Sequence, residues 1–132
     1  MTVFKKLARN DRGAVAVEMA FALPVLTTVM IGILQFGLVL QASGAMRHGI
    51  GEGLRLAKIH GSTPAEDVEE RVRESLAGVR LDGIESLEFE RGTIDGADWG
   101  QISMTYEMEP FIPFAPIPPI VLTETKRVWL PS

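Results

Sequence analysis

Residues 19–40 read MAFALPVLTTVMIGILQFGLVL and contain no charged side chain. A helix that crosses a bilayer needs about 20 mostly apolar residues, and this run is long enough. The apolar stretch already begins at Ala14, so we expect a transmembrane helix over residues 14–40. A buried core helix is the alternative, but the rest of the chain is too small to surround such a helix on all sides.

The charges on the two sides of this segment differ in sign. Residues 1–13 form a basic leader of net charge +3, and from Arg47 onward nine Lys or Arg face fifteen Asp or Glu, a net charge of −6. The positive-inside rule keeps a short basic segment in the cytoplasm. We therefore expect the N-terminus inside, and residues 61–132 as a small acidic domain on the other side of the membrane.

Several function classes are excluded by composition. The 132 residues include no Cys, which rules out disulfides, Cys-ligated zinc, iron–sulfur clusters and thiol catalysis. The isoelectric point near 5.2 argues against nucleic acid as a partner. His48 and His60 lack metal-ligand spacing, and the alternate glycines of residues 49–53 lie in a helix pattern and not after a strand. We therefore expect no enzyme, no cofactor and no metal site.

Glu18 is the one acid inside the first turns of the apolar run. A carboxylate near the centre of a membrane helix is disfavoured by about 2.5–3.5 kcal/mol, so such groups usually have a partner or a function. One interpretation places Glu18 near the headgroups, where it marks the helix start and gains from the helix dipole. A second interpretation gives it a partner: cleavage of the Gly13–Ala14 bond would create a charged amine on Ala14, about 6 Å of helix rise away. A staggered neighbouring subunit could then pair its new amine with this carboxylate.

The N-terminal pattern resembles a known family. A basic leader, Arg12-Gly13, small apolar residues, Val17-Glu18 and then AFALPVL over residues 20–26 are similar to the N-terminus of TadE-like pseudopilins, of the tight-adherence (Flp-type) branch of type IV pili. Met19 stands where an aromatic residue commonly follows the glutamate. The specific part of the resemblance covers about residues 9–40.

The resemblance implies a function and partners. It implies cleavage after Gly13 by a prepilin peptidase, and it makes Glu18 the fifth-position glutamate of the mature chain. The chain would then be a minor pseudopilin of the bacterial inner membrane, with a periplasmic domain. Its partners would be the peptidase, other pilins and pseudopilins, and the pilus assembly platform protein. Pro24 fits a proline that pilin helices carry, although a harmless kink explains it equally well.

Two other fates remain open for this chain. One is a single-pass anchor for a periplasmic adaptor domain. The other is a secreted protein, cleaved after the small residues Ala42-Ser43-Gly44 or one residue later. Signal-peptide apolar regions run to about 7–15 residues, which is shorter than this one. The first residue of the mature protein distinguishes all three fates.

The long helix is expected to continue to residue 60 and to end at Gly61. A stripe of small residues recurs every fourth position, at Ala45, Gly49, Gly53 and Ala57. Met46, Ile50 and Leu54 form an apolar stripe beside it. Small stripes allow close backbone approach, and for Gly49 and Gly53 we favour packing against the chain's own sheet over packing against neighbouring pilin helices.

A second helix should follow Thr63, which is expected to cap it with Pro64 in its first position, and it should close near Gly78. Its acidic residues are expected to form a solvated face and not a metal site: Glu66, Asp67, Glu69, Glu70 and Glu74. Three strands are then expected, over residues 86–91, 101–109 and 121–130, with Asp95-Gly96 in the first turn. The fold class is α+β, with a small antiparallel sheet on the long helix.

The segment PFIPFAPIPP, residues 110–119, cannot be a helix interior or a central strand. Phe111 and Phe114 are unusually apolar for a free linker. The segment is expected either to pack onto its own domain or to contact another pilin or the membrane surface.

Overall fold

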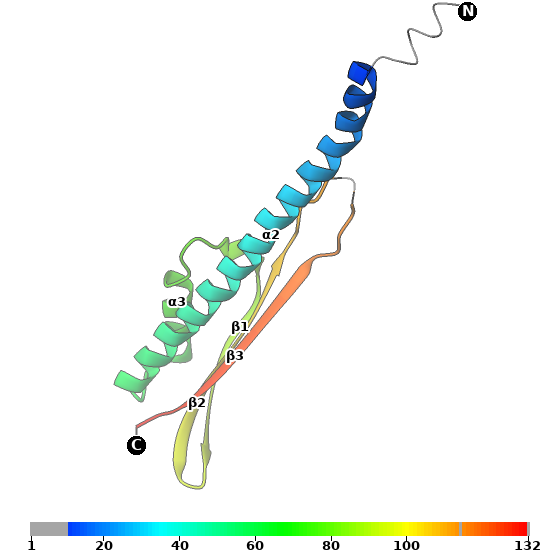
Figure 1. The fold of residues 1–132 in the computed structure, drawn as a ribbon. Coiled ribbons are helices and arrows are strands. Elements are labelled where there is room, and N and C mark those ends of the chain that lie inside the picture. The colour runs from blue at the N-terminus through cyan, green and yellow to red at the C-terminus, as the bar shows by residue number, and fades with distance from the viewer. Residues whose placement is uncertain (1–10, 114, 132) are drawn as a thin grey trace, which may run out of the picture.

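The computed structural model describes residues 11–113 and 115–131. The chain opens with one long helix, and a second helix and three strands follow it (Figure 1). The elements in chain order are α2 (Asp11–Ile59), α3 (Ala65–Glu74), the 3-10 turn η1 (Leu81–Gly83), β1 (Ile84–Ile94), β2 (Ala97–Met108) and β3 (Ile120–Trp129). At 49 residues, α2 is about 74 Å long. The second half of this helix carries the whole domain, and the first half extends away from it.

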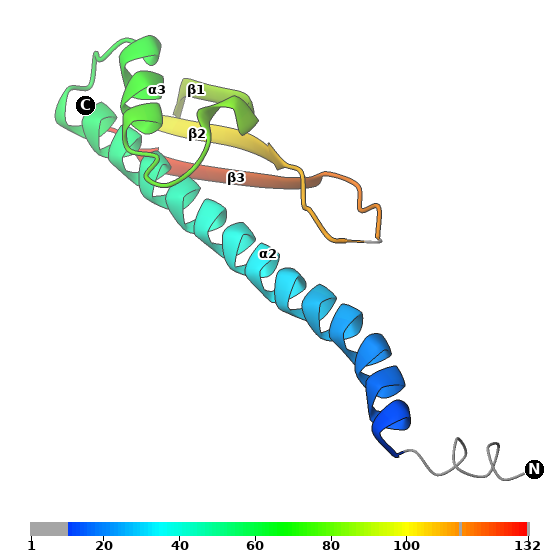
Figure 2. The same cartoon turned by 90° about the horizontal axis from the view of Figure 1, so that it is seen from above.

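The domain has two layers. The sheet has the order β1-β2-β3 with both pairs antiparallel, and Figure 2 shows the two helices lying together on one side of it. The helix α2 contacts β2 and β3, while α3 contacts β1. This arrangement confirms the predicted α+β class with a small antiparallel sheet on a long helix.

The core lies where α2 crosses the sheet. Met46, Ile50 and Leu54 are fully buried, which confirms the predicted apolar stripe. They meet the inward face of β2, whose alternating Ile102 and Met104 are also fully buried. Alternation along β2 and fourfold spacing along α2 are the two periodicities that a helix-on-sheet core requires.

The small-residue stripe is used inside the domain. A Cβ atom on Gly53 would lie 2.5 Å from Val72 Cγ2, and one on Gly49 would lie 3.0 Å from Leu76 Cδ2. Ala57 is fully buried, and Ala45 is half-buried against the core. The predicted packing of these glycines against the sheet is therefore only partly right: both lie against α3, because glycine lets the two helix backbones approach closely, and a Cβ on Gly53 would also lie 3.0 Å from Ile102 Cδ1 on β2.

The second helix differs from its prediction at both ends. The Thr63 hydroxyl does not cap it, because that hydroxyl donates to the carbonyl oxygen of His60 at 2.7 Å. Pro64 takes the N-cap position with no side-chain bond, and the helix begins at Ala65. It ends at Glu74, before Gly78, whose φ of +73° belongs to the following turn. Local turn bonds set these ends, and sequence spacing alone does not reveal them.

The three strands lie where they were expected, and β1 and β2 are longer than predicted. The antiparallel pairing of β1 and β2 runs up to Ile94 opposite Ala97, so the turn has only two residues. Asp95 and Gly96 both have positive φ, 51° and 80°, which is the conformation of a tight type I′ hairpin. The predicted turn chemistry of Asp95-Gly96 is confirmed.

We expect a methyl group at Gly53 to destabilise the domain. In Gly53→Ala the new Cβ lies 2.5 Å from Val72 Cγ2 and 3.1 Å from the Val68 carbonyl oxygen. Overpacking of this kind costs about 1–3 kcal/mol, which exceeds the gain in helix propensity of up to about 1 kcal/mol. Denaturant unfolding of the detergent-solubilised chain, followed by circular dichroism, measures the change.

Gly51→Ala is the matched control, because a Cβ there meets nothing within 4 Å. It gains helix propensity without a clash and should be at least as stable as the unmodified chain. Equal stability of the two variants would contradict close packing of α2 against α3.

Candidate functional site

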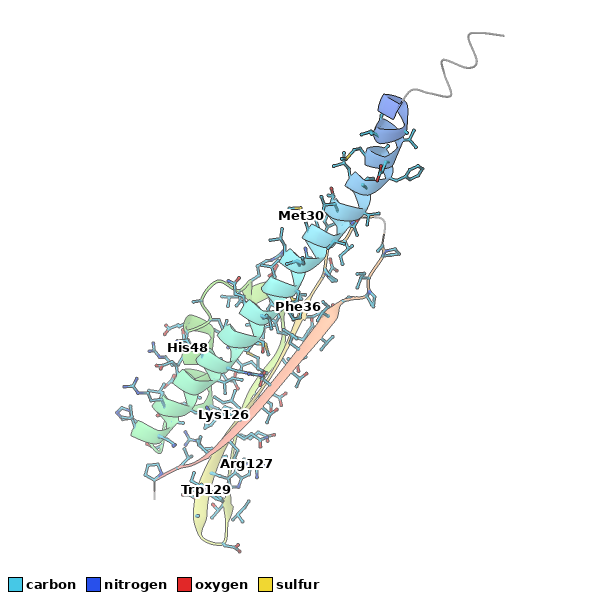
Figure 3. All side chains as sticks on the ribbon, in the orientation of Figure 1. Met30, Phe36, His48, Lys126, Arg127 and Trp129 are labelled. Atoms are coloured by element: carbon cyan, nitrogen blue, oxygen red, sulfur yellow. The ribbon has the colours of Figure 1, made fainter. Side chains whose placement is uncertain are left out.

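The first half of α2 is an apolar helix with no covering. Its most apolar window has a mean hydropathy of 2.1, and none of that window is buried. Phe21 is 75% exposed and Ile33 66%, and Met30 and Phe36 project from the same part of the helix (Figure 3). The alternative of a buried core helix is therefore wrong: this segment is a candidate membrane span, and bilayer lipid or other apolar helices must cover it.

Gly13 and Ala14 lie in the first turn of α2, which begins at Asp11. Both are exposed, and a Cβ on Gly13 would meet nothing within 4 Å. The first turn of a helix lacks intrahelical partners for its N–H groups, and glycine lowers helix propensity by about 1 kcal/mol. This turn can therefore unwind at little cost and offer an extended backbone to a protease.

Glu18 lies one turn further along the helix and is exposed. It makes no hydrogen bond or ion pair with any side chain in the described part of the chain. It is four positions after Ala14, so the two residues lie about 6 Å apart along the helix axis. Any protein partner of this carboxylate would therefore come from outside the described residues.

Pro24 lies inside α2 and removes one backbone hydrogen bond from it. Figure 2 shows the helix axis bending in its N-terminal part. One turn later the Thr28 hydroxyl donates to the Pro24 carbonyl oxygen at 2.8 Å, as expected for a hydroxyl in an apolar helix. This bond gives the Thr28 hydroxyl a partner within its own helix.

Polar side chains of α2 fasten the helix to the domain just beyond the apolar segment. Gln41 Nε2 donates to the Gly78 carbonyl oxygen at 3.0 Å, and Arg47 Nε donates to Glu124 Oε1 at 2.8 Å. The hydroxyl of Ser43 donates to the same oxygen at 3.4 Å. Sequence spacing gives no sign of the pair of Arg47 and Glu124, because the two residues are 77 positions apart in the chain.

An open groove of about 530 Å³ lies between α2 and the end of the sheet. On the helix side it is lined by Gln35 and Leu38, and on the other side mostly by charged residues: Arg80, Asp82, Glu85, Glu107 and Glu109. The hydrogen bond from the Arg80 guanidinium holds the pKa of the Asp82 carboxyl below its usual value. Both side chains of this exposed pair therefore stay charged at neutral pH.

The predicted acidic face carries contacts within the protein. The Phe89 backbone N–H donates to Glu69 Oε1 at 3.2 Å, and Arg71 approaches both Glu52 and Glu74. Within residues 11–113 and 115–131 no group of His, Asp and Glu could hold a metal ion. Of the five predicted acids, Glu69 and Glu74 therefore have partners within the protein.

The segment between β2 and β3 does not pack fully onto the domain. Phe111 is 70% exposed and Ile117 40%. Phe114, which was predicted as a second contact residue, lies outside the described residues, as do residues 1–10 of the basic leader. The structure thus brings together Gly13, Ala14 and Glu18 on one free helix end and keeps Phe111 on a separate loop.

Comparison with known proteins bears on the same end of the chain. Residues 13–55 match the family model of TadE-like protein. The match confirms the resemblance drawn from Gly13, Glu18 and the apolar run after them. No curated protein and no solved structure gives a significant match to the chain. The TadE-like segment includes the exposed apolar helix and Gly49 and Gly53, and it stops before α3 and the sheet.

The membrane span can be tested with single cysteines, because the chain has none of its own. We expect Ile33→Cys to be shielded from a membrane-impermeant maleimide in spheroplasts. Gly44→Cys should react, because Gly44 is exposed beyond the apolar segment. The rate of maleimide labelling, in intact and in detergent-treated spheroplasts, measures the accessibility of each of the two cysteines.

A large increase in labelling on detergent treatment is expected for position 33 only. Equal and fast labelling of both positions in intact spheroplasts would contradict a bilayer around α2. Labelling of neither position before treatment would contradict the proposed orientation.

Proposed function

We propose that this TadE-like chain is a minor pseudopilin of a tight-adherence (Flp-type) pilus system. The observation that carries the proposal is the free first half of α2, which is apolar and unburied and lies within the TadE-like match. It would be held in the inner membrane by residues 14–40, with the basic N-terminus in the cytoplasm. The acidic domain of α3 and the sheet would stand in the periplasm.

Processing would occur at the Gly13–Ala14 bond by the prepilin peptidase of the same system. The exposure of both residues in the first turn of α2 supports access. Removal of the leader would leave Ala14 as a charged amine at the start of an apolar helix. The cost of leaving this amine unpaired in lipid favours assembly with a carboxylate.

Glu18 would supply that carboxylate to a neighbouring subunit. It is exposed, has no bond to a described side chain, and lies about 6 Å along the axis from Ala14. Subunits staggered by about that rise would pair amine with carboxylate at each contact. Two charges that are costly alone would then stabilise one register of the helices.

Helix packing in a pilus or an initiating complex would use the first half of α2. Gly49 and Gly53 support this assignment indirectly, because α3 already fills the space above them. Other pilins and pseudopilins would therefore contact the apolar segment, and the assembly platform protein would act on it within the membrane. We infer a structural role for the chain, in which it is a peptidase substrate and not an enzyme.

The continuity of α2 bears on the secretory alternative. The helix runs unbroken through Ala42, Ser43 and Gly44, and Ala42 is buried in the core. Cleavage after Gly44 would remove Ala42 and the Gln41 bond to Gly78 from the domain. These contacts favour a chain that keeps its apolar helix.

The processing step predicts the mature N-terminus. Purified from its native host, the protein should begin at Ala14, as read by intact-mass spectrometry. Gly13→Leu should block cleavage, because the bulky side chain replaces the bare backbone of the cleavage position. The blocked chain would keep the mass of the full leader.

Gly44→Leu is the matched control and should still begin at Ala14. A mature chain that begins at Ala45 or Met46 would instead support the secreted protein. An intact leader in the native host would leave only a membrane-anchored domain.

If Glu18 pairs with a neighbouring subunit, the efficiency with which the chain enters pili should depend on the negative charge of this residue. We expect Glu18→Gln to insert normally but to enter pili at least about tenfold less, a difference of about 1.4 kcal/mol. Glu18→Asp keeps the charge on a shorter side chain and should lose less. Quantitative immunoblotting of sheared pili against membranes measures the ratio.

The same ratio for the unmodified chain and Glu18→Gln would contradict a pairing role for this carboxylate. Thr28→Val serves as a control, because Thr28 bonds only within its own helix. It should leave incorporation unchanged.

A further inference from the structure

The loop between β2 and β3, residues 109–119, is apolar after its first residue, Glu109. Residues 110–119 read PFIPFAPIPP and contain no charged or hydrogen-bonding side chain. Phe111 and Ile117 expose 70% and 40% of their surface. An apolar surface of this kind on a loop indicates a contact that the isolated chain does not make.

The loop points towards the membrane-spanning part of the helix. In Figures 1 and 2 it leaves the end of the sheet and extends in the same direction as the N-terminal half of α2. Figure 3 shows it passing the level of Phe36, a residue of the apolar segment. The β1–β2 hairpin lies at the opposite end of the sheet.

Charged residues show where the membrane surface lies. The groove beside Gln35 and Leu38 is lined by Arg80, Asp82 and Glu107. Ionised groups stay out of the hydrocarbon, so the headgroup region lies at this level or nearer the N-terminus, and the last residues of the 14–40 segment lie among the headgroups and not in the hydrocarbon. The loop extends beyond this charged level in the direction of the bilayer.

We propose that the loop of residues 110–119 inserts Phe111 and Ile117 into the outer leaflet, beside the chain's own transmembrane helix. The proposal rests on the membrane span of α2 but not on assembly into a pilus. The occupant of the apolar surface is lipid at the boundary of headgroups and acyl chains. Apolar side chains of peripheral elements settle about 5–10 Å deep there.

The backbone of the loop suits this position. Irregular backbone in lipid is costly because its N–H groups lose their water partners. Five of the ten residues from 110 to 119 are proline, which has no N–H group. The Ala115 N–H is itself bonded to the Ile112 carbonyl oxygen at 3.3 Å. Few donors therefore need water, and the stiff prolines reduce the entropy lost on insertion.

A second membrane contact would fix the domain against the bilayer. The helix alone fixes one point, and the loop, which connects to β2 and β3, adds a second point on the sheet. With both in place the sheet cannot rotate freely about the helix axis relative to the membrane.

Lipid contact can be measured on the full chain in phosphatidylcholine nanodiscs at one copy per disc. Phe111→Cys and Ile117→Cys each provide a unique thiol for a bimane label, because the chain has no Cys. Fluorescence is compared with and without lipids that carry a nitroxide on the acyl chain near the headgroup. Ile33→Cys on the apolar helix is the positive control, and Ala97→Cys in the distant hairpin is the negative control. The ratio for each variant cancels local quenching by neighbouring side chains such as Trp99.

We expect the labels at 111 and 117 to lose fluorescence to nitroxide lipids nearly as strongly as the label at 33. The label at 97 should lose almost none. Loss at 33 but not at 111 or 117 would overturn the loop proposal and leave the membrane span intact. No loss at 33 would overturn the span on which the proposal rests.

Crowding the discs separates lipid from protein as the partner. If positions 111 and 117 show no loss at one copy per disc, and become shielded from aqueous iodide only with several copies, the loop contacts another subunit. That result would also overturn the proposal. Loss of fluorescence to nitroxide lipids at one copy per disc, unchanged when more copies are present, supports insertion of the loop into lipid.

Discussion

One helix has to satisfy two solvents along its length. In the proposed membrane span of α2, lipid can hydrogen-bond no backbone group, so the N–H and C=O groups have to be paired within the helix. In the second half, the helix has to bury a narrow stripe against a sheet and a short helix in water. The backbone stays helical throughout, and only the side chains change. Up to Leu40 the helix is apolar on all sides, and beyond it the apolar side chains form a stripe on one side, with Met46, Ile50 and Leu54. The separation of anchor and domain depends on this change.

The transition between these regimes is held by polar contacts. Gln41 reaches the turn at Gly78, and Arg47 reaches Glu124 on β3. Exposed ion pairs contribute little to stability, so these contacts mainly orient the domain on its helix. The buried stripe and the closely packed α3 supply most of the stabilisation, because they remove apolar surface from water.

Much of this fold follows from patterns in the chain. The long apolar run predicts the span, fourfold spacing predicts the buried face of α2, and alternation in Gln101–Glu109 predicts β2. Asp95-Gly96 predicts the hairpin because few residues tolerate two positive φ angles in succession. These features depend on local sequence, and the structure places each of them within a few residues.

Other features depend on contacts between distant residues, which spacing does not reveal. Gly49 and Gly53 suggest close packing, yet only the fold shows that α3 lies above both and that the sheet approaches Gly53 alone, through Ile102. The Thr63 hydroxyl had two acceptable partners, and the bond to His60 in the preceding turn prevails over a helix cap. At the candidate site, residues 13–18 could be recognised from sequence, because a cleavage position and a nearby acid are local. The pairing of Arg47 with Glu124 and the charged groove beside Gln35 could not, since both join segments that are far apart in the chain.

The absence of any break in α2 between Leu40 and Met46 has a mechanical consequence. A hinge there would let the domain swivel while the anchor stayed still. A continuous helix instead transmits torque and tension. A tilt or a rotation imposed on the apolar N-terminal half of α2 therefore moves the sheet by the same angle. A force that pulls on the domain acts on the proposed membrane span along its axis. The free energy of transferring that apolar segment out of the bilayer then sets the force at which the protein leaves the membrane.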